Sequence, residues 1–294
     1  MNTPFFTGTC TALVTPFLSG QVNYPMLERL LQRQMDAGIR TVVICGTTGE
    51  ASTLTDNEKL ELIRRAKEYV ADSMTVIAGT GSNCTEHAAW LSEEAQKRGA
   101  DAVLAVSPYY NKATEEGLFA HYASIADAVT IPLILYNVPS RTGFDISVSA
   151  CRRLSRVGNI VGIKEAGMSI GKITNILAQC GPHFSVWSGN DDMTVPMLAL
   201  GGQGVISVVS NVVPELVEAM TSAGLAGDFD TAAALQQRLQ PLCEVLFREV
   251  NPVPVKAAMK ILGYDCGDCR LPLTKAKAET ELLLKRLLKE RKQS

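Results

Sequence analysis

The segment IVGIKEAG, residues 160–167, has the composition of a buried strand but carries a lysine near its end. Its isoleucines and valine are β-branched, which favours strand structure. Alternate residues of a strand share a face, so if Ile160 and Gly162 point inward, Lys164 does too, and Gly162 leaves room for its long side chain. Removing an ammonium group from water costs free energy. The burial of a lysine at this position therefore requires either a chemical role or a compensating charge.

Seven further apolar runs of this kind lie along the chain, and helical patterns separate them. Each run is short and mostly apolar on both faces, as parallel strands covered by helices are. The predicted strands are residues 9–15, 41–47, 75–80, 102–107, 132–138, 160–166, 184–189 and 203–209. The predicted helices are residues 26–37, 55–70, 85–98, 115–128, 147–155, 170–180, 191–200 and 214–224.

Eight strands, each followed by a helix, predict an α/β fold of the (β/α)8 TIM-barrel type over residues 1–225. A doubly wound sheet is the alternative, but it more often shows a glycine-rich nucleotide turn after its first strand, where this chain has LVTPF. Residues 226–294 lack strand patterns and predict a C-terminal helical domain. Its helices are expected at residues 229–249, 253–263 and 274–291.

Composition narrows the function classes. The chain has 294 residues, of which 46% are hydrophobic, enough for a large core, and its net charge of −2 gives no reason to expect a nucleic-acid partner. No secretory signal or bilayer-length apolar run is recognisable, so we expect a cytoplasmic protein without membrane contact. The spacing of Cys266 and Cys269 lacks the second pair that a zinc site needs, so no metal is expected.

The ends of the predicted strands carry the polar groups. TIM-barrel active sites lie at the carboxyl ends of the strands. Desolvation there would lower the pKa of Lys164 and make its amine a nucleophile toward a keto group. A lysine that reaches the rim or pairs with a carboxylate is the alternative. Tyr136 ends the preceding strand and could move protons during imine formation, or could simply cap the core.

Three further loops suit carboxylates or a neighbouring subunit. The GTTGE turn, residues 46–50, offers backbone N–H groups that could hold a carboxylate, although it could also be only a tight turn. Arg141 has the fork-shaped cation that fits a second carboxylate, or it forms a surface salt bridge. Tyr109 and Tyr110 place two aromatic rings on one loop, for packing or for contact with a neighbouring subunit.

Nine short motifs in order along the chain resemble the dihydrodipicolinate synthase family, within the wider group of class I lysine-Schiff-base aldolases and lyases. The resemblance covers nearly the whole chain, and it is the ordered set rather than any one motif that is specific. The motifs are ALVTPF (12–17), GTTGE (46–50), AGTG (78–81), PYYN (108–111), YNVP (136–139), GIKE (162–165), SGN (188–190), GVIS (204–207) and NPVPVK (251–256).

The resemblance implies a role for each catalytic candidate. Lys164 would form a Schiff base with pyruvate, and Tyr136 would donate and accept the protons. Thr47 would link Tyr136 to Tyr110, which the adjacent subunit would supply in a homotetramer. The lysine takes the place of a cofactor, so none is expected.

The resemblance also implies the substrates and their binding groups. Thr48, Ile206 and Gly189 would bind pyruvate. Arg141 would bind the carboxylate of L-aspartate-4-semialdehyde, which the pyruvate enamine attacks. The product would be 4-hydroxy-tetrahydrodipicolinate, at the first committed step of the diaminopimelate and lysine branch of amino-acid biosynthesis.

Two alternatives remain open from the sequence. A pyruvate-forming sugar-acid aldolase, such as an N-acetylneuraminate or 2-keto-3-deoxy acid lyase, would share the lysine, the tyrosine and the glycine turn. Arg141 and the Thr47–Thr48 pair favour the synthase. A non-catalytic sensor would be expected to have lost Lys164 or Tyr136, and both are present.

Feedback inhibition by lysine is expected to be weak or absent. The resemblance implies an inhibitor site at the subunit interface. Lys59 and His87 would be unfavourable neighbours for a cationic ligand there. The residues of this site would be Ser52, Asp56, Lys59, Asn83, His87 and Tyr109.

Overall fold

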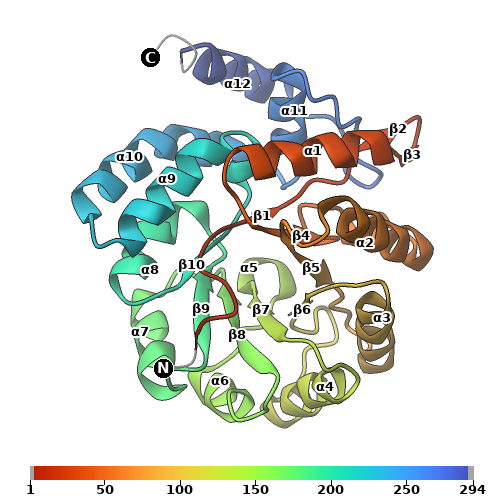
Figure 1. Cartoon of the computed structure of the whole chain (residues 1–294), viewed down its shortest axis with the longest axis vertical. Helices are drawn as coiled ribbons and strands as arrows, with labels where there is room; N and C mark the ends of the chain where they lie inside the picture. The colour runs from red at the N-terminus through yellow and green to blue at the C-terminus, as the bar shows by residue number, and fades with distance from the viewer. Residues whose placement is uncertain (1–2, 291–294) are drawn as a thin grey trace.

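The computed structural model describes residues 3–290 and contains a closed barrel of eight parallel strands surrounded by helices (Figure 1). The strand order around the barrel is β1-β10-β9-β8-β7-β6-β5-β4, and β4 closes on β1. The predicted TIM barrel is confirmed. The strands are β1 (Gly8–Ala12), β4 (Thr41–Ile44), β5 (Thr75–Gly79), β6 (Ala102–Val106), β7 (Leu133–Asn137), β8 (Ile160–Glu165), β9 (Ser185–Ser188) and β10 (Gly204–Ser207).

All eight predicted barrel helices are present. Thr55 forms the expected capping box with Glu58 at the start of α2, which satisfies backbone N–H groups that the first turn leaves free. The helices are α1 (Tyr24–Asp36), α2 (Asp56–Val70), α3 (Thr85–Lys97), α4 (Glu115–Asp127), α6 (Val148–Leu154), α7 (Ile170–Gln179), α8 (Thr194–Ala199) and α9 (Pro214–Leu225).

Short elements escaped the sequence analysis because they are too brief to show a period. A hairpin of two-residue strands, β2 (Phe17–Leu18) and β3 (Gln21–Val22), follows β1. One four-residue helix, α5 (Pro139–Thr142), follows β7 and carries Arg141. Single 3-10 turns are η1 (Ala51–Thr53), η2 (Asp191–Met193) and η3 (Val209–Asn211).

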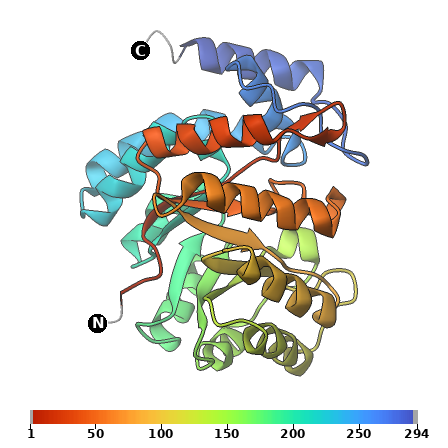
Figure 2. The same cartoon turned by 45° about the vertical axis from the view of Figure 1, so that its right-hand side comes forward.

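The C-terminal region is helical, as predicted. It comprises α10 (Phe229–Leu246), α11 (Val253–Ile261) and α12 (Ala278–Glu290). The last helix begins four residues later than expected, and residue 291 lies outside the described residues. α10 packs on α9, and α11 and α12 pack together beside α1 (Figures 1 and 2). A domain boundary at residue 226 stays a prediction.

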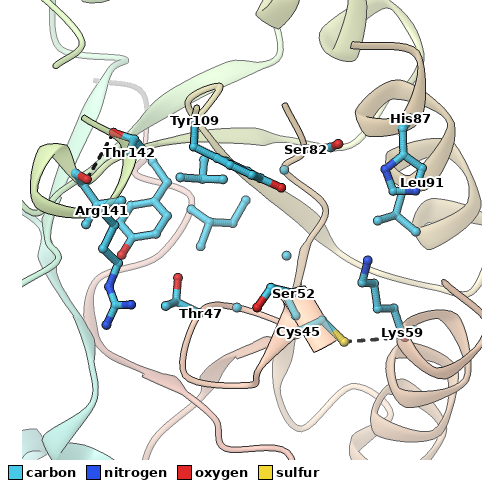
Figure 3. Close-up of a pocket in the computed structure, with 18 residues that line it drawn as sticks. Cys45, Thr47, Ser52, Lys59, Ser82, His87, Leu91, Tyr109, Arg141 and Thr142 are labelled. Carbon is cyan, nitrogen blue, oxygen red and sulfur yellow. Dashed lines mark hydrogen bonds between the residues drawn. The ribbon is translucent and has the colours of Figure 1, made fainter. Parts of the chain in front are cut away.

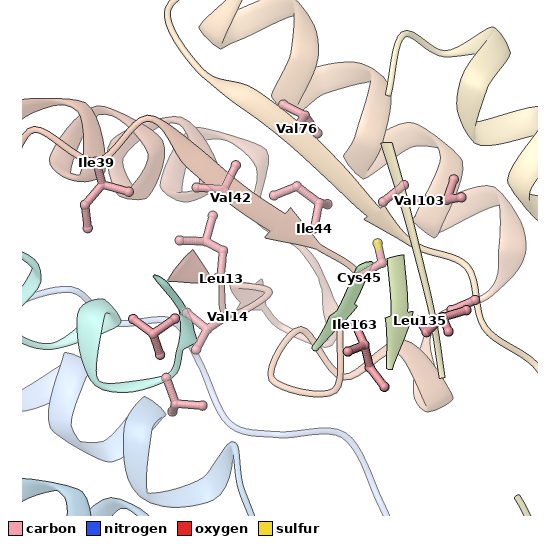
Figure 4. Packing of buried hydrophobic residues seen from close by; sticks show 14 of the residues in the cluster. Leu13, Val14, Ile39, Val42, Ile44, Cys45, Val76, Val103, Leu135 and Ile163 are labelled. Atoms are coloured by element: carbon pink, nitrogen blue, oxygen red, sulfur yellow. The ribbon is translucent and has the colours of Figure 1, made fainter. Parts of the chain in front are cut away.

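Two hydrophobic layers hold the barrel together. The outer layer lies between the strands and the helices and contains alternate strand residues such as Val42, Val103, Leu135 and Ile163 (Figure 4). The inner layer fills the barrel and includes Phe6, Cys10, Val43, Ile77, Leu104, Ile134, Trp187 and Ile206. The alternation of the two layers decides which strand residues face the barrel interior. No helix within residues 3–290 is long and apolar enough to cross a bilayer.

β8 contains an irregularity that corrects the sequence analysis. Leu133 pairs with Ile160 and Ile134 with Gly162, so Val161 is an extra residue in β8. Ile160 belongs to the outer layer together with Ile163. The prediction that Ile160 points inward was therefore wrong, because strict alternation does not allow for the extra residue.

The space beside Gly162 is used by an aromatic ring and not by Lys164. A Cβ on Gly162 would lie 2.3 Å from the Ser185 carbonyl oxygen and 2.7 Å from the Trp187 ring. That ring stacks on Phe6 with centroids 4.6 Å apart, and its Nε1 donates to the Phe6 carbonyl at 3.1 Å. Phe6 precedes β1, so this stack fills the amino end of the barrel interior.

Gly162→Ala is expected to lower the free energy of unfolding by about 1–3 kcal/mol, the usual cost of overpacking a core. The reason is the close approach of the Ser185 carbonyl and the Trp187 ring. The melting temperature measures the effect. Gly158→Ala is the control, because a Cβ there meets no heavy atom within 4 Å, and it should change stability by less than about 0.5 kcal/mol. Equal melting temperatures for the two variants would contradict this packing.

Candidate active site

Lys164 lies near the carboxyl end of β8, with only 6% of its surface exposed. It is paired across the strands with Tyr136 at the end of β7. Its Nζ lies 4.4 Å from the centroid of the Tyr136 ring, a cation–π contact. The side chain therefore does not extend to the rim, and no carboxylate within residues 3–290 forms an ion pair with it at 4.0 Å or less. Of the interpretations offered for Lys164, the structure agrees with a buried amine beside a tyrosine, and not with a lysine at the rim or in an ion pair.

A buried carboxylate contributes to the electrostatic surroundings of Lys164. Asp191 follows β9 and is 3% exposed, and burial raises the pKa of its carboxyl group. Hydrogen bonds from the Ser207 hydroxyl and the backbone N–H of Val208, and the positive charge of Lys164, act in the opposite direction. The sequence analysis gives Asp191 no role, because nothing local shows that it is buried.

A second polar network joins the ends of β7 and β8 on their outer side. Glu165 is 1% exposed and accepts hydrogen bonds from the Asn137 side chain at 2.8 and 3.0 Å. Lys172 of α7 lies 3.2 Å from the same carboxylate and compensates its charge. Because Asn137 and Glu165 directly follow Tyr136 and Lys164 in the chain, the network fixes the strand ends that carry those two side chains.

A cavity of about 400 Å³ opens at the carboxyl ends of β4 to β7 (Figure 3). One part is lined by Thr47, Tyr136 and Arg141, so the structure brings together three of the predicted site residues. Another part is lined by Lys59 and His87, from α2 and α3. In Figure 3 Arg141 and Thr47 lie on one side of the cavity, and Lys59 and His87 lie on the other.

The remaining predicted residues lie outside this cavity wall, and Lys164 is one of them, because it is Tyr136 beside it that lines the cavity. Thr48 is 2% exposed, and its hydroxyl accepts a hydrogen bond from the Asn251 side chain at 2.9 Å. Ile206 is fully buried in β10 and belongs to the inner layer. Gly189 follows β9 and has no space for a side chain, because a Cβ would lie 2.7 Å from the Ala166 Cβ.

Tyr110 is not brought into the site of its own chain. It is 93% exposed and has a φ of 70°, in the left-handed region, so its ring projects from the loop after β6. Its neighbour Tyr109 lines the cavity instead.

The far part of the cavity contains a compact charged cluster. Asp56 accepts from Lys59 Nζ at 3.1 Å through one oxygen and lies 3.0 Å from His87 Nε2 through the other. Partial burial alone would raise the pKa of Asp56, but the hydrogen bonds from His87 and Lys59 more than offset this and lower it. Lys59 and His87 are thus tied to a carboxylate of their own chain.

Asn251 is a site contact that the sequence analysis quoted in a motif but did not assign. Besides the hydrogen bond to Thr48, its backbone oxygen accepts from Arg141 Nη2 at 3.2 Å. The NPVPVK motif was the available signal. What it could not show is that this C-terminal segment returns to the mouth of the barrel.

Comparison with known proteins places the chain in a family. The model of the "Dihydrodipicolinate synthetase family" matches residues 5–291. A curated relative from Acetivibrio thermocellus, named 4-hydroxy-tetrahydrodipicolinate synthase, is 47% identical over 290 residues, which are 99% of each chain.

Solved structures agree with this match. The dihydrodipicolinate synthase from Aquifex aeolicus has a TM-score of 0.96 and 44% identity over 98% of each chain. The chloride-inhibited enzyme from Acinetobacter baumannii, solved in complex with pyruvate, has a TM-score of 0.95 and 39% identity, over 97% of this chain and 98% of that one. The chain belongs to the dihydrodipicolinate synthetase family.

Proposed function

We propose that the chain is a Schiff-base-forming lyase that condenses pyruvate with L-aspartate-4-semialdehyde to give 4-hydroxy-tetrahydrodipicolinate. The observation that carries the proposal is the buried amine of Lys164 against the ring of Tyr136. It occurs in a chain that is 47% identical, over nearly its full length, to a relative named as this synthase. The reaction would serve lysine and diaminopimelate biosynthesis.

The chemistry begins with attack of the neutral Lys164 amine on the keto carbon of pyruvate. The carbinolamine that forms loses its hydroxyl as water, for which Tyr136 supplies the proton. Loss of a methyl proton from the resulting Schiff base gives an enamine, whose carbon attacks the aldehyde carbon of the second substrate. Burial of the amine keeps competing water away from these intermediates.

Proton transfer would run from Tyr136 through Thr47 to Tyr110 of a neighbouring copy. Thr47 and Tyr136 line the same cavity, which supports the first step. Tyr110 is exposed on its own chain, as a side chain offered to another subunit would be. The proposal thus includes a homo-oligomer, a tetramer by resemblance to the family, and a cytoplasmic location.

The two substrate carboxylates would bind to different groups. Thr48, in the GTTGE turn, would hold the pyruvate carboxylate, with Ile206 and Gly189 completing that side of the site. Arg141 lines the cavity and uses Nη2 for the Asn251 carbonyl, so its other N–H groups are suited to the second carboxylate. A sugar-acid aldolase is less favoured, since both Arg141 and the named relatives fit the synthase better.

Reduction with borohydride in the presence of pyruvate should add a pyruvate-sized mass to the intact protein, because hydride traps a Schiff base as a stable amine. Lys164→Ala should show no adduct. Lys260→Ala is the control, because that side chain is 65% exposed, and it should label like the parent. An unlabelled parent would remove the basis of the proposed mechanism.

Arg141→Ala should lower kcat/KM for L-aspartate-4-semialdehyde by about 10- to 100-fold, the loss expected from one hydrogen-bonded charge contact. The pyruvate adduct on Lys164 should form as in the parent, because pyruvate binds deeper. Steady-state kinetics with each substrate varied measures the difference. Faster turnover of N-acetylneuraminate than of the condensation substrates would favour the sugar-acid aldolase instead.

L-lysine should inhibit the enzyme weakly or not at all. Lys59 and His87 already share the carboxylate of Asp56, and a second cation would meet like charge there. A steady-state assay with increasing L-lysine at fixed substrate concentrations tests this. Strong inhibition at lysine concentrations comparable with the substrate KM values would contradict it.

A further inference from the structure

The GTTGE turn ends in a glutamate that is buried and ion-paired. Glu50 has a φ of 57°, which is uncommon for a residue with a side chain, and only 2% of its surface is exposed. One carboxylate oxygen accepts from Lys256 Nζ at 2.6 Å, and the other accepts from the backbone N–H of Arg270 at 2.9 Å. The turn is therefore held through its last side chain by residues more than 200 positions away.

Lys256 approaches from the first turns of α11. Its side chain is 3% exposed, and its Nζ lies 4.2 Å from the centroid of the Phe17 ring. A buried ion pair is weak support for stability, because desolvation of both charges offsets much of their attraction. What such a pair does supply is a fixed geometry, since moving either partner leaves a charge buried alone.

Asn251, five residues earlier, reaches the same side of the site. Its side chain is buried and donates to the Thr48 hydroxyl at 2.9 Å, while its backbone oxygen accepts from Arg141 at 3.2 Å. One short C-terminal segment thus contacts Thr48, Glu50 and Arg141. The hydrogen bonds inside the turn, such as Glu50 N–H to the Thr47 oxygen at 3.1 Å, close it. On its other side the turn is tied to the segment after β1, where the Thr15 hydroxyl donates to the Gly49 carbonyl at 2.6 Å.

We propose that Asn251 and Lys256, here called the C-terminal clamp, are positioning residues. Through Glu50 and Thr48 they set the orientation of the GTTGE turn, and so the position in which Thr48 meets pyruvate and Thr47 meets Tyr136. This inference rests on the proposed function for the substrate role of the turn. The C-terminal region is then part of the machinery that aligns the substrate, and not only a cover on the barrel.

The test replaces the ion pair at nearly constant volume. Lys256→Met with Glu50→Gln removes both charges together and keeps an acceptor for the Arg270 N–H, which avoids a lone buried charge. Lys67→Met with Asp101→Asn is the control, a pair with the same bonding pattern that is more exposed. In this pair the Asp101 carboxylate likewise lies 2.9 Å from Lys67 Nζ and accepts a hydrogen bond from a backbone N–H, that of Val76. Asp101 precedes β6, at the end of the barrel opposite the site.

Two readouts separate positioning from general stability. Hydrogen–deuterium exchange of the peptide covering residues 46–54 should become at least about tenfold faster in the Glu50/Lys256 double variant and stay unchanged in the control. The KM for pyruvate should rise about tenfold, with a smaller change in kcat, because a loosened turn weakens pyruvate binding more than the later steps. The control should keep the parent KM even if it melts at a lower temperature.

Asn251→Ala tests the other half of the clamp with a smaller change, since it keeps the backbone oxygen that Arg141 uses. Its effect on the pyruvate KM should be strongly non-additive with that of Thr48→Val, because the two residues share one hydrogen bond. Additive effects would overturn a role of Asn251 that acts through Thr48.

The outcomes distinguish this inference from the proposed function. Unchanged exchange in residues 46–54 of the double variant would overturn the clamp, whether or not Lys164 binds pyruvate. Faster exchange with a parent-like pyruvate KM would show that the turn is held but that its orientation does not serve binding, and would also overturn it. Failure of the proposed function is read separately, as an unlabelled parent in the borohydride experiment.

Discussion

Closure of the parallel barrel is the constraint on which the rest of the structure depends. β1 pairs with both β4 and β10, which closes the barrel, and because every pairing around it is parallel, all eight strands end at one mouth. Residues far apart in the sequence, such as Thr47, Tyr136 and Lys164, are therefore delivered to the same end of the molecule. The interior is packed with apolar side chains, so an amine that enters it from the mouth has little contact with water.

The site is built from chemically different supports around that amine. Tyr136 provides an aromatic face, Asp191 a buried carboxylate at longer range, and the Asn137–Glu165 network a rigid outer hold on the strand ends. The C-terminal segment adds contacts from a region that belongs to no strand or helix of the barrel. Precise alignment of a small substrate is easier when the supporting groups are themselves held on several sides.

Sequence patterns predicted the eight strands and the barrel helices, because their apolar runs and caps are local signals. The inward direction of Lys164 was also predicted, but from a wrong premise, since the extra residue Val161 in β8 cannot be recognised in a uniformly apolar run. Gly162 was misinterpreted because its neighbour is Trp187, from another strand. The contact of Lys256 with Glu50 spans 206 positions, and no local pattern encodes it. Features that depend on neighbouring residues in the sequence could thus be predicted, whereas contacts between residues from different strands could not.

The stack of Phe6 on Trp187 affects how small molecules can reach Lys164. It fills the amino end of the barrel interior, so a small molecule would reach Lys164 from the carboxyl end, where Tyr136 also lies. Under the proposed chemistry, the compound bonded to the amine lies deepest and has to arrive first, and the second reactant sits above it. Depth alone would then impose a sequence of arrival on two reactants of similar size.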